Sequence, residues 1–424
     1  MKLLLIQPSK YLEVEGGLYG LAALATYVEK YCEVRVFNPN DSLADTVIKF
    51  NPDIVGVTAS TLSYNRAIDI MKAIRLLAPK ALRIVGGPHI SCLPESLDPV
   101  FDVGVVGDGE ETLLDIVRNC TKNDAAEIPG TCHREGNRTI INPRQPPDLD
   151  TLPIPKLHTY APQSYKHGIV GFITSRGCPF NCVFCYSKVM REKVSYHSLE
   201  WVADQFEYVT KTLRAKFLVL WDDNVCLDLN RLVAIAQELE HRQINEFELC
   251  ANLRSSIVSD ELCQVLQRLH VHNCFSGFES GSDRVLKAVK GQDSSVDKHK
   301  ETIRLAHKYG INLTVNFMLG MPEEKIEDMK KTLDLISYIY DEKRAGRFHG
   351  RVCVNMAIPF PGTYWWKIAE ARGVVSNRMD WKKLRDNPES ALLLSPEITL
   401  EEWRDICKIA RSKVEEAGDI VVWN

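Results

Sequence analysis

The strongest constraint on the fold is that short apolar runs alternate with segments of helical periodicity, in two successive series. Helical patterns in the first series lie at Gly20–Lys30 and Tyr64–Leu77. Strands separated by helices are typical of a parallel, doubly wound sheet, in which ligands bind beyond the carboxyl ends of the strands. We therefore predict a Rossmann-like α/β domain over residues 1–125, with these strands: Leu3–Gln7, Val34–Asn38, Asp53–Thr58, Arg83–Val85 and Gly104–Val106.

Residues 126–167 have a different character and are predicted to form a linker. Proline recurs through this segment, from Pro129 to Pro155. Proline ends helices and restricts the residue before it, so the segment is expected to be irregular. A small hairpin is expected around Glu135-Gly-Asn137, where a turn residue follows a short strand-like run.

The second series begins at Gly168 and contains six strand–helix units. Such units predict a partial (β/α)6 barrel over residues 168–362, a TIM-like architecture whose chemistry lies at the carboxyl ends of the strands. Residues 363–424 are rich in charge and tryptophan, and we expect a helical C-terminal region there. Tyr364, Trp365, Trp366 and Trp381 are expected to anchor its helices, and the alternative is that they line a substrate pocket. The predicted barrel strands are Ile169–Thr174, Phe217–Trp221, Glu248–Asn252, Asn273–Gly277, Leu313–Leu319 and Val352–Ile358.

Charge and hydropathy narrow the class of function. The chain of 424 residues has a net charge of −4, so it lacks the basic excess that neutralises phosphates in nucleic-acid binding. No apolar run approaches the ~20 residues of a membrane span. The N-terminal Met1-Lys-Leu-Leu-Leu-Ile-Gln-Pro lacks the longer apolar region of a secretory signal. We expect a cytoplasmic protein that acts on a small molecule, without a nucleic-acid partner.

Thirteen cysteines are many for such a chain, but most of them are scattered. An odd, scattered set argues against a disulfide framework. Free cysteines behave as small hydrophobic residues, so most are expected in the core. This interpretation applies to Cys32, Cys120, Cys250, Cys263, Cys274, Cys353 and Cys407.

Three cysteines cluster directly after the first predicted barrel strand, in Cys178-Pro-Phe-Asn-Cys182-Val-Phe-Cys185. Thiolates hold iron–sulfur clusters, normally four to a cluster. A loop with three of them leaves one iron without a protein ligand, and an open metal site can bind substrate. Structural zinc is the competing interpretation, but it usually takes four ligands in two separated pairs. No second pair of cysteines follows, and no paired histidines flank the loop.

This loop resembles the hallmark CxxxCxxC of the radical S-adenosylmethionine superfamily, whose cysteines hold a [4Fe-4S] cluster that cleaves S-adenosylmethionine. The resemblance extends to segments at the ends of later strands, including Gly320-Met-Pro322 and Pro359-Phe-Pro361. It implies contacts with S-adenosylmethionine from Phe184, Asp222, Asp223, Arg254, Glu279 and Ser280. Four of these residues also have a plainer interpretation: helix-capping acids for the two aspartates, a surface cation for Arg254, and an ion pair with lysine for Glu279.

The domain before the barrel resembles a cobalamin-binding domain, an arrangement shared by a branch of this superfamily. Paired glycines let backbone approach a bulky ligand because no Cβ intrudes. Many such domains ligate cobalt through a histidine, but the first loop, Gln7–Gly17, contains none. His89 has the wrong spacing for that role and is expected to make ordinary hydrogen bonds. The cobalamin contacts implied by the resemblance are Ser60, Leu62, Gly86, Gly87, Gly107 and Glu110.

The resemblance implies an enzyme that takes one electron from ferredoxin or flavodoxin and forms a 5′-deoxyadenosyl radical. With cobalamin bound, the leading hypothesis is methylation of an unactivated carbon of a small-molecule or natural-product substrate. One alternative is a radical mutase, dehydratase or cyclase without methyl transfer. Another, from a different class, is a non-catalytic iron–sulfur or zinc module. A domain without cobalamin, used only for packing or for binding a partner, also remains open.

Overall fold

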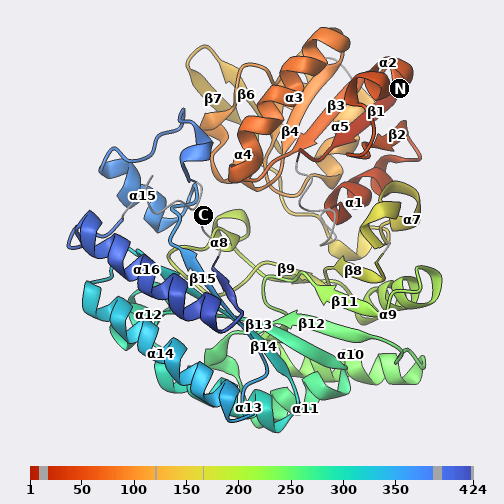
Figure 1. Cartoon of the computed structure of the whole chain (residues 1–424). Helices are drawn as coiled ribbons and strands as arrows, with labels where there is room; N and C mark the ends of the chain where they lie inside the picture. Colours follow the sequence, from red (N-terminus) through yellow and green to blue (C-terminus); the bar gives the residue numbers. More distant parts are fainter. Residues whose placement is uncertain (9–17, 120–121, 166, 385–393, 422–424) are drawn as a thin grey trace.

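The computed structural model describes residues 1–8, 18–119, 122–165, 167–384 and 394–421, and contains two seven-stranded sheets (Figure 1). The first sheet has the order β2-β1-β3-β4-β5-β6-β7. Its first five strands in this order are parallel, whereas β5–β6 and β6–β7 pair antiparallel. The strands are β1 Lys2–Ile6, β2 Glu33–Val36, β3 Ile54–Thr58, β4 Leu82–Gly86, β5 Val103–Val105, β6 Thr131–Glu135 and β7 Arg138–Ile141.

Helices cover both faces of this first sheet, because its parallel strands are apolar on both sides. Leu3 and Leu5 of β1 pack with α1 (Tyr19–Val28) and α5 (Glu110–Asn119). Leu4 and Ile6 pack on the other face, against α2, α3 and α4. The doubly wound sheet predicted from the sequence is thereby confirmed. The helices of the second face are α2 Leu43–Phe50, α3 Tyr64–Leu77 and α4 Pro88–Cys92.

The segment predicted as a linker contains a hairpin, formed by β6 and β7 around Gly136 with a φ of +61°. This hairpin continues the first sheet through the pairing of Gly104 with Cys132. Residues 131–141 therefore pack with the N-terminal sheet rather than running free between the two domains. Pro129 precedes the hairpin, and the other prolines of the segment follow it, where the chain crosses to the second sheet.

The second sheet has the order β16-β15-β14-β13-β12-β11-β8, and all of its neighbouring strands are parallel. Apart from the short edge strand β16, neighbours in this order follow the chain, as the predicted partial barrel requires. The sheet stays open between β8 and β16. Its strands are β8 Ile169–Phe172, β11 Phe217–Leu220, β12 Glu248–Asn252, β13 Val271–Glu279, β14 Asn312–Leu319, β15 Gly350–Met356 and β16 Ile420–Val421.

Helices pack on the outside of the second sheet (Figure 1). Alternate strand residues such as Leu218, Cys274 and Phe317 are buried in one core with these helices. A short antiparallel pair, β9 (Ser175–Arg176) with β10 (Ser195–Tyr196), lies at the carboxyl end of β8. The outer helices are α9 Leu199–Glu207, α10 Leu229–His241, α11 Asp260–Arg268, α12 Asp283–Lys290, α13 Val296–Lys308 and α14 Ile326–Arg344.

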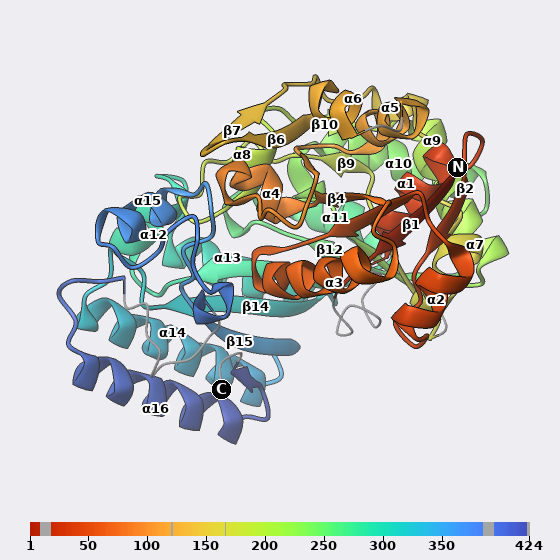
Figure 2. The same ribbon diagram turned by 90° about the horizontal axis from the view of Figure 1, so that it is seen from above.

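The C-terminal region ties the two parts of the chain together. Trp365 and Trp366 of α15 (Tyr364–Ala371), together with Trp381, are buried in one core with α3 of the first domain. Tyr364 is 56% exposed, so it does not anchor the region as expected. The last helix, α16 (Leu400–Glu416), contacts α14 and β15. Figure 2 shows α16 and α14 at one end of the molecule and β2 with α2 at the other.

No helix within the described ranges is both long enough and apolar enough to cross a membrane. Of the core cysteines expected from the sequence, Cys263, Cys274 and Cys407 are fully buried, and Cys32, Cys250 and Cys353 are partly buried. Cys120 lies outside the described residues. All twelve described cysteines are free thiols.

Candidate active site

The three-cysteine loop begins where β9 ends, at the mouth of the open barrel. Gly177 has a φ of +93°, and a Cβ there would lie 2.5 Å from the carbonyl oxygen of Lys193, so only glycine fits. The amide of Cys185 donates to the carbonyl of Cys182 at 3.1 Å and closes a tight turn. Cys178, Cys182 and Cys185 are all partly exposed. Burial raises the pKa of the Cys178 and Cys185 thiols.

The three thiols of the loop come from one short segment of the chain. Among the residues that the structure describes, no group of three histidine, cysteine or acidic side chains converges on one ion position. Tetrahedral zinc needs all of its ligands around a single ion. In a [4Fe-4S] cluster each cysteine binds a different iron, so the sulfurs stand further apart. Three cysteines in one loop are thus the number of thiolates that a [4Fe-4S] cluster with one open iron requires.

The two aspartates after β11 hold the backbone that leads into the cysteine loop. Asp222 is buried and accepts from the backbone N–H of Thr174 at 3.0 Å, from its hydroxyl at 2.8 Å, and from the Ser175 hydroxyl. Asp223 accepts from the Gly177 N–H at 2.9 Å and from the Ser187 hydroxyl at 2.5 Å. Burial raises the pKa of Asp222, while these hydrogen bonds oppose the rise. Asp222 and Asp223 were predicted to contact a ligand. In the structure their hydrogen bonds hold the backbone of the cysteine loop and of the residues just before it.

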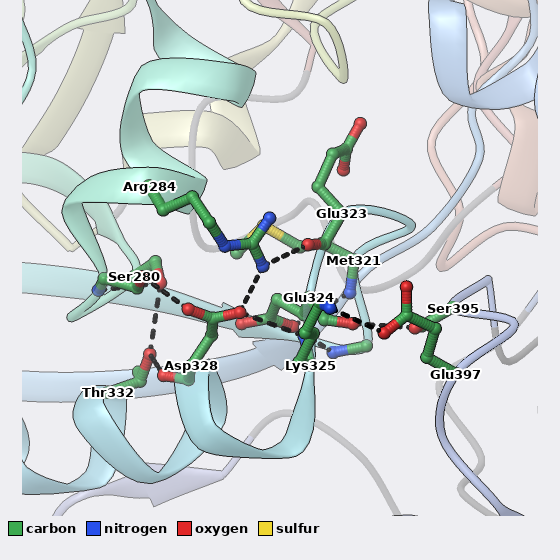
Figure 3. Close-up of polar contacts among 12 residues, drawn as sticks. Ser280, Arg284, Met321, Glu323, Glu324, Lys325, Asp328, Thr332, Ser395 and Glu397 are labelled. Carbon is green, nitrogen blue, oxygen red and sulfur yellow. Dashed lines mark hydrogen bonds and ion pairs between the residues drawn. The ribbon is translucent and has the colours of Figure 1, made fainter.

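Glu279 and Ser280, at the end of β13, are both buried. Glu279 lies 3.5 Å from the ammonium of Lys290, which also donates to the Gly277 carbonyl. Burial raises the pKa of Glu279, and Lys290 opposes the rise. The ion pair with lysine, the plainer of the two interpretations, is therefore present. Ser280 lies away from the cysteine loop, 3.2 Å from the Thr332 hydroxyl of α14 (Figure 3).

Phe184 and Arg254, which were also predicted to contact S-adenosylmethionine, contact other residues of the protein. Phe184 packs against Trp365 of α15, with ring centroids 5.3 Å apart. Arg254 is buried at the end of β12, and one of its nitrogens lies 3.2 Å from the sulfur of Cys182. The structure thus brings Asp223 and Arg254 to the cysteine loop, of which Phe184 is a part, whereas Ser280 lies elsewhere.

The loop after β14 holds an acid that the sequence interpretation did not single out. The carboxylate of Glu324 is buried and accepts from the backbone N–H groups of Gly320 and Met321, at 2.8 and 3.0 Å. Burial raises the pKa of Glu324 to about 8. Nearby, Asp328 accepts hydrogen bonds from Arg284 and from Ser282 (Figure 3). The carboxylate fixes the shape of this loop at the carboxyl end of its strand.

A cavity of about 280 Å³ lies at the carboxyl ends of β1, β3, β4 and β5. Its lining includes four of the six predicted cobalamin contacts: Gly86, Gly87, Gly107 and Glu110. Thr58, the last residue of β3, lines it as well and was missed in the sequence. Part of the wall comes from the second domain, through Ile173, Arg176 and Arg191.

The other two predicted contacts, Ser60 and Leu62, lie outside this cavity. They line a separate cavity of about 180 Å³ with Cys92, Tyr186 and Phe360 among its other walls. The chain turns into a short 3-10 helix at Thr61–Ser63, capped by reciprocal hydrogen bonds between Ser60 and Ser63. This turn directs Ser60 and Leu62 away from the glycines.

The larger cavity has features that fit a cobalamin. Backbone is open at Gly107, where a Cβ would meet nothing within 4 Å, and at Gly86, where the nearest atom would be 3.7 Å away. The buried Nε atoms of Arg176 and Arg191 have no hydrogen-bond partner. Buried donors without partners are rare in proteins, and cobalamin carries amide and phosphate oxygens that accept hydrogen bonds. The enclosed volume would hold part of the molecule, such as its nucleotide arm.

A buried ion network joins the two domains at this cavity. Arg176 of β9 pairs with Asp108 at 2.9 Å and with Glu110 at 2.7 Å, and Arg191 also pairs with Asp108. The side chains of Arg176, Asp108 and Glu110 are each at most 10% exposed. Glu110 therefore contacts the other domain directly, while it lines the cavity.

His89 is buried and makes ordinary hydrogen bonds, as expected from the sequence. Its Nδ1 lies 3.1 Å from the Thr61 hydroxyl, and its Nε2 lies 3.0 Å from the Ser96 hydroxyl. The ring also packs against Tyr64 and Trp381. With both nitrogens engaged, this histidine does not serve as a metal ligand.

The buried His89 predicts a loss of stability in acid. Burial lowers the pKa of His89 to about 3, whereas an unfolded histidine titrates near 6.5. Between these values the unfolded state binds a proton that the folded state does not, so the free energy of unfolding falls as the pH falls. For cofactor-free His89→Gln, the loss between about pH 7 and 4.5 should shrink by roughly 2–3 kcal/mol.

Urea unfolding at both pH values measures this difference. His241→Gln, at the exposed end of α10, is the matched control and should keep the wild-type dependence on pH. If His89→Gln lost as much stability in acid as the wild type, the buried imidazole would not be the cause.

Comparisons with known proteins agree with this geometry. Residues 13–117 match the B12 binding domain family, and residues 172–336 match the Radical SAM superfamily. An uncharacterized methyltransferase of Pyrococcus horikoshii is 27% identical over 405 residues, which cover 90% of this chain and 86% of that protein. The anaerobic magnesium-protoporphyrin IX monomethyl ester cyclase of Rubrivivax gelatinosus is 24% identical over 69% of this chain and 55% of its own length.

A solved structure shares the fold over the whole chain. The radical S-adenosylmethionine methyltransferase TsrM from Kitasatospora setae, with cobalamin and a [4Fe-4S] cluster bound, superposes with a TM-score of 0.79 at 18% identity. The match covers 100% of this chain and 91% of TsrM. The chain therefore has a B12-binding domain followed by a radical SAM domain. It is a radical SAM enzyme similar to cobalamin-dependent methyltransferases, which confirms the resemblance drawn from the cysteine loop.

Proposed function

We propose that the protein is a cobalamin-dependent radical SAM methyltransferase that methylates an unactivated carbon of a small molecule. The main observation behind this proposal is that one segment of the chain belongs both to the wall of the cavity and to the cysteine loop. Ile173, Arg176 and Arg191 line the B12-domain cavity, and the stretch between Arg176 and Arg191 contains all three cluster cysteines. A ligand in the cavity thus lies beside the cysteine loop, as a methyl donor and a radical source must.

Cys178, Cys182 and Cys185 would hold a [4Fe-4S] cluster, and Gly86, Gly87, Gly107 and Thr58 would face the cobalamin. When bound, the cluster supplies one electron that cleaves S-adenosylmethionine to methionine and a 5′-deoxyadenosyl radical, and cobalamin supplies a methyl group. Asp223 fixes the cysteine loop through Gly177 and Ser187.

Arg176 joins the two domains at the cavity and would help to exclude water from it. It does so through ion pairs with Asp108 and Glu110, which are themselves buried. Exclusion of water protects a reactive radical from side reactions. The chain's own residues therefore supply position and enclosure, while the cofactors supply the bond chemistry.

We further propose that ferredoxin or flavodoxin donates the electron and that the protein works in the cytoplasm. The free thiols of all twelve described cysteines suit a reducing compartment. The test of methyl transfer is incubation of the reconstituted protein with S-adenosylmethionine labelled in its methyl group and a small-molecule extract. A labelled product that requires cobalamin supports the proposal. Radical cleavage with an unlabelled, altered product would instead favour a cyclase or mutase, as the similarity to the magnesium-protoporphyrin cyclase suggests.

Filling the cavity at Gly86 should weaken cobalamin binding. Gly86 lines the cavity, and a Cβ there would have ordinary contact with Val105 at 3.7 Å, so the domain itself should tolerate a side chain. In Gly86→Leu the added side chain competes with the ligand for space, at a cost of about 1–3 kcal/mol. Equilibrium binding of hydroxocobalamin, followed by its absorbance, should weaken roughly 5- to 150-fold.

Ser60→Leu is the matched control, because Ser60 follows the same sheet edge but lies outside the cavity. It should weaken binding less than Gly86→Leu does. The opposite order would mean that the cobalamin contacts the Ser60–Leu62 segment rather than the glycines.

A further inference from the structure

Arg254 makes polar contacts with several protein groups near the cysteine loop. Its side chain is 6% exposed. Nε donates to the Ser256 hydroxyl at 2.7 Å, and Nη2 contacts the Lys290 carbonyl at 2.7 Å, the Ser294 hydroxyl at 3.0 Å and Asp293 at 3.1 Å. The guanidinium is thereby fixed from the side of the α12–α13 connection.

The other side of the same guanidinium faces the cysteine loop. Nη1 donates to the sulfur of Cys182 at 3.2 Å, and the guanidinium carbon lies 3.9 Å from the centre of the Phe180 ring. Arg254 thus joins three segments: the end of β12, the cysteine loop and the connection between α12 and α13. Its Nε, Nη1 and Nη2 atoms each contact a protein acceptor, which leaves little for a carboxylate ligand.

We infer that Arg254 is a positioning residue that holds Cys182 and makes the bound cluster easier to reduce, rather than a contact to S-adenosylmethionine. The inference rests on the proposed cluster at Cys178, Cys182 and Cys185. It goes beyond that proposal because it assigns a redox role to a side chain outside the ligand set.

The physical basis is the effect of a donor and a positive charge on a thiolate ligand. Hydrogen bonds to the sulfurs and the net charge near a cluster set its reduction potential. Reduction adds a negative charge, and a cation within contact distance stabilises that charge more strongly where water is excluded. Arg254 is buried, whereas its counter-ion Asp293 is 47% exposed and more strongly screened. The positive charge that Arg254 places at Cys182 is therefore offset only in part by Asp293.

The geometry also explains why lysine would not substitute fully. The planar guanidinium reaches Cys182, Ser256 and the α12–α13 connection from three nitrogens at once. An ammonium group keeps the charge but lacks the rigid fork. Arg254→Lys should therefore retain part of the effect, and Arg254→Gln should lose it.

The test is a redox titration of the anaerobically reconstituted holoprotein, followed by electron paramagnetic resonance of the reduced cluster. In Arg254→Gln the ratio of reduced to oxidised cluster at a fixed potential should fall about tenfold, which for a one-electron couple corresponds to about 59 mV. Arg254→Lys should show a smaller fall. The matched control is Arg231→Gln, which removes a partly buried cation that contacts the Thr174 carbonyl instead of a cysteine. Its ratio should equal that of the wild type.

An unchanged ratio in both Arg254 variants, with full cluster content, would overturn the inference. If Arg254→Gln failed to fold, Arg254→Lys would decide alone: a fall supports the role and no change refutes it. A fall of equal size in Arg231→Gln would also refute it, because any nearby charge would then suffice. Failure of the proposed cluster, on which the inference rests, is distinguishable, since the wild-type protein would then assemble no cluster. Failure of methyl transfer alone would leave the redox titration unaffected.

Discussion

Replacement of Cys178, Cys182 and Cys185 by alanine is expected to abolish iron–sulfur binding and S-adenosylmethionine cleavage together. The three thiols are the ligands that the loop offers, and the aspartates beneath it supply only hydrogen bonds. Without a cluster no electron reaches the sulfonium, so an acceleration on the order of 10⁶-fold or more should disappear. Iron and sulfide content, and 5′-deoxyadenosine formed after addition of a reductant, measure the effect.

The matched control is Cys32→Ala, a partly buried cysteine of the first domain far from the loop in sequence. It should keep both the cluster and the cleavage activity. Equal iron content in the triple variant and in the wild type would show that the loop is not the cluster site.

Replacement of Arg176 by methionine is expected to destabilise the folded protein by roughly 3–5 kcal/mol. The change leaves the buried carboxylate of Glu110 without its partner, and Asp108 keeps only Arg191. Removal of one member of a buried ion pair is costly because an uncompensated charge remains in a poorly solvated place. Urea unfolding, with both domains followed by separate probes, measures the loss of unfolding free energy.

A second substitution tests the cause of that loss. In Arg176→Met/Glu110→Gln the unpaired charge is removed as well, so part of the stability should return. Arg304→Met, which breaks the exposed pair of Arg304 with Glu301, should cost under about 1 kcal/mol. An Arg176→Met loss no larger than this control would contradict the role of the interdomain network.

The strand–helix order was predictable because it depends on local patterns. Leu3–Gln7 is buried along its whole length, as in a strand covered on both faces, whereas Leu313–Leu319 alternates buried with partly buried residues. Both patterns are typical of strands. The two-residue strand β16 was not predictable, since a pairing of Ile420 with Cys353 has no pattern of its own. The hairpin at Gly136 was predicted from its turn, but its addition to the first sheet was not.

The cysteine loop was predictable from its spacing, and the direction of the side chains around it was not. Thr58 and Ser60 are two residues apart, yet only Thr58 lines the larger cavity, because β3 ends at Thr58 and the chain then turns into the 3-10 helix that Ser60 caps. Ser280 follows Glu279 directly, but its hydroxyl contacts α14 on the other side of the sheet. Such directions depend on contacts between segments far apart in the chain, which spacing does not encode.

The central claim is that one chain holds a radical-generating cluster and a cobalamin in adjoining sites. The most direct measurement is to reconstitute the oxygen-free protein with iron, sulfide and hydroxocobalamin, desalt it, and determine its cobalamin together with the 5′-deoxyadenosine formed from S-adenosylmethionine. The account predicts stoichiometric cobalamin and 5′-deoxyadenosine in the same sample. A protein that retains neither, and behaves like its triple cysteine variant, would contradict it.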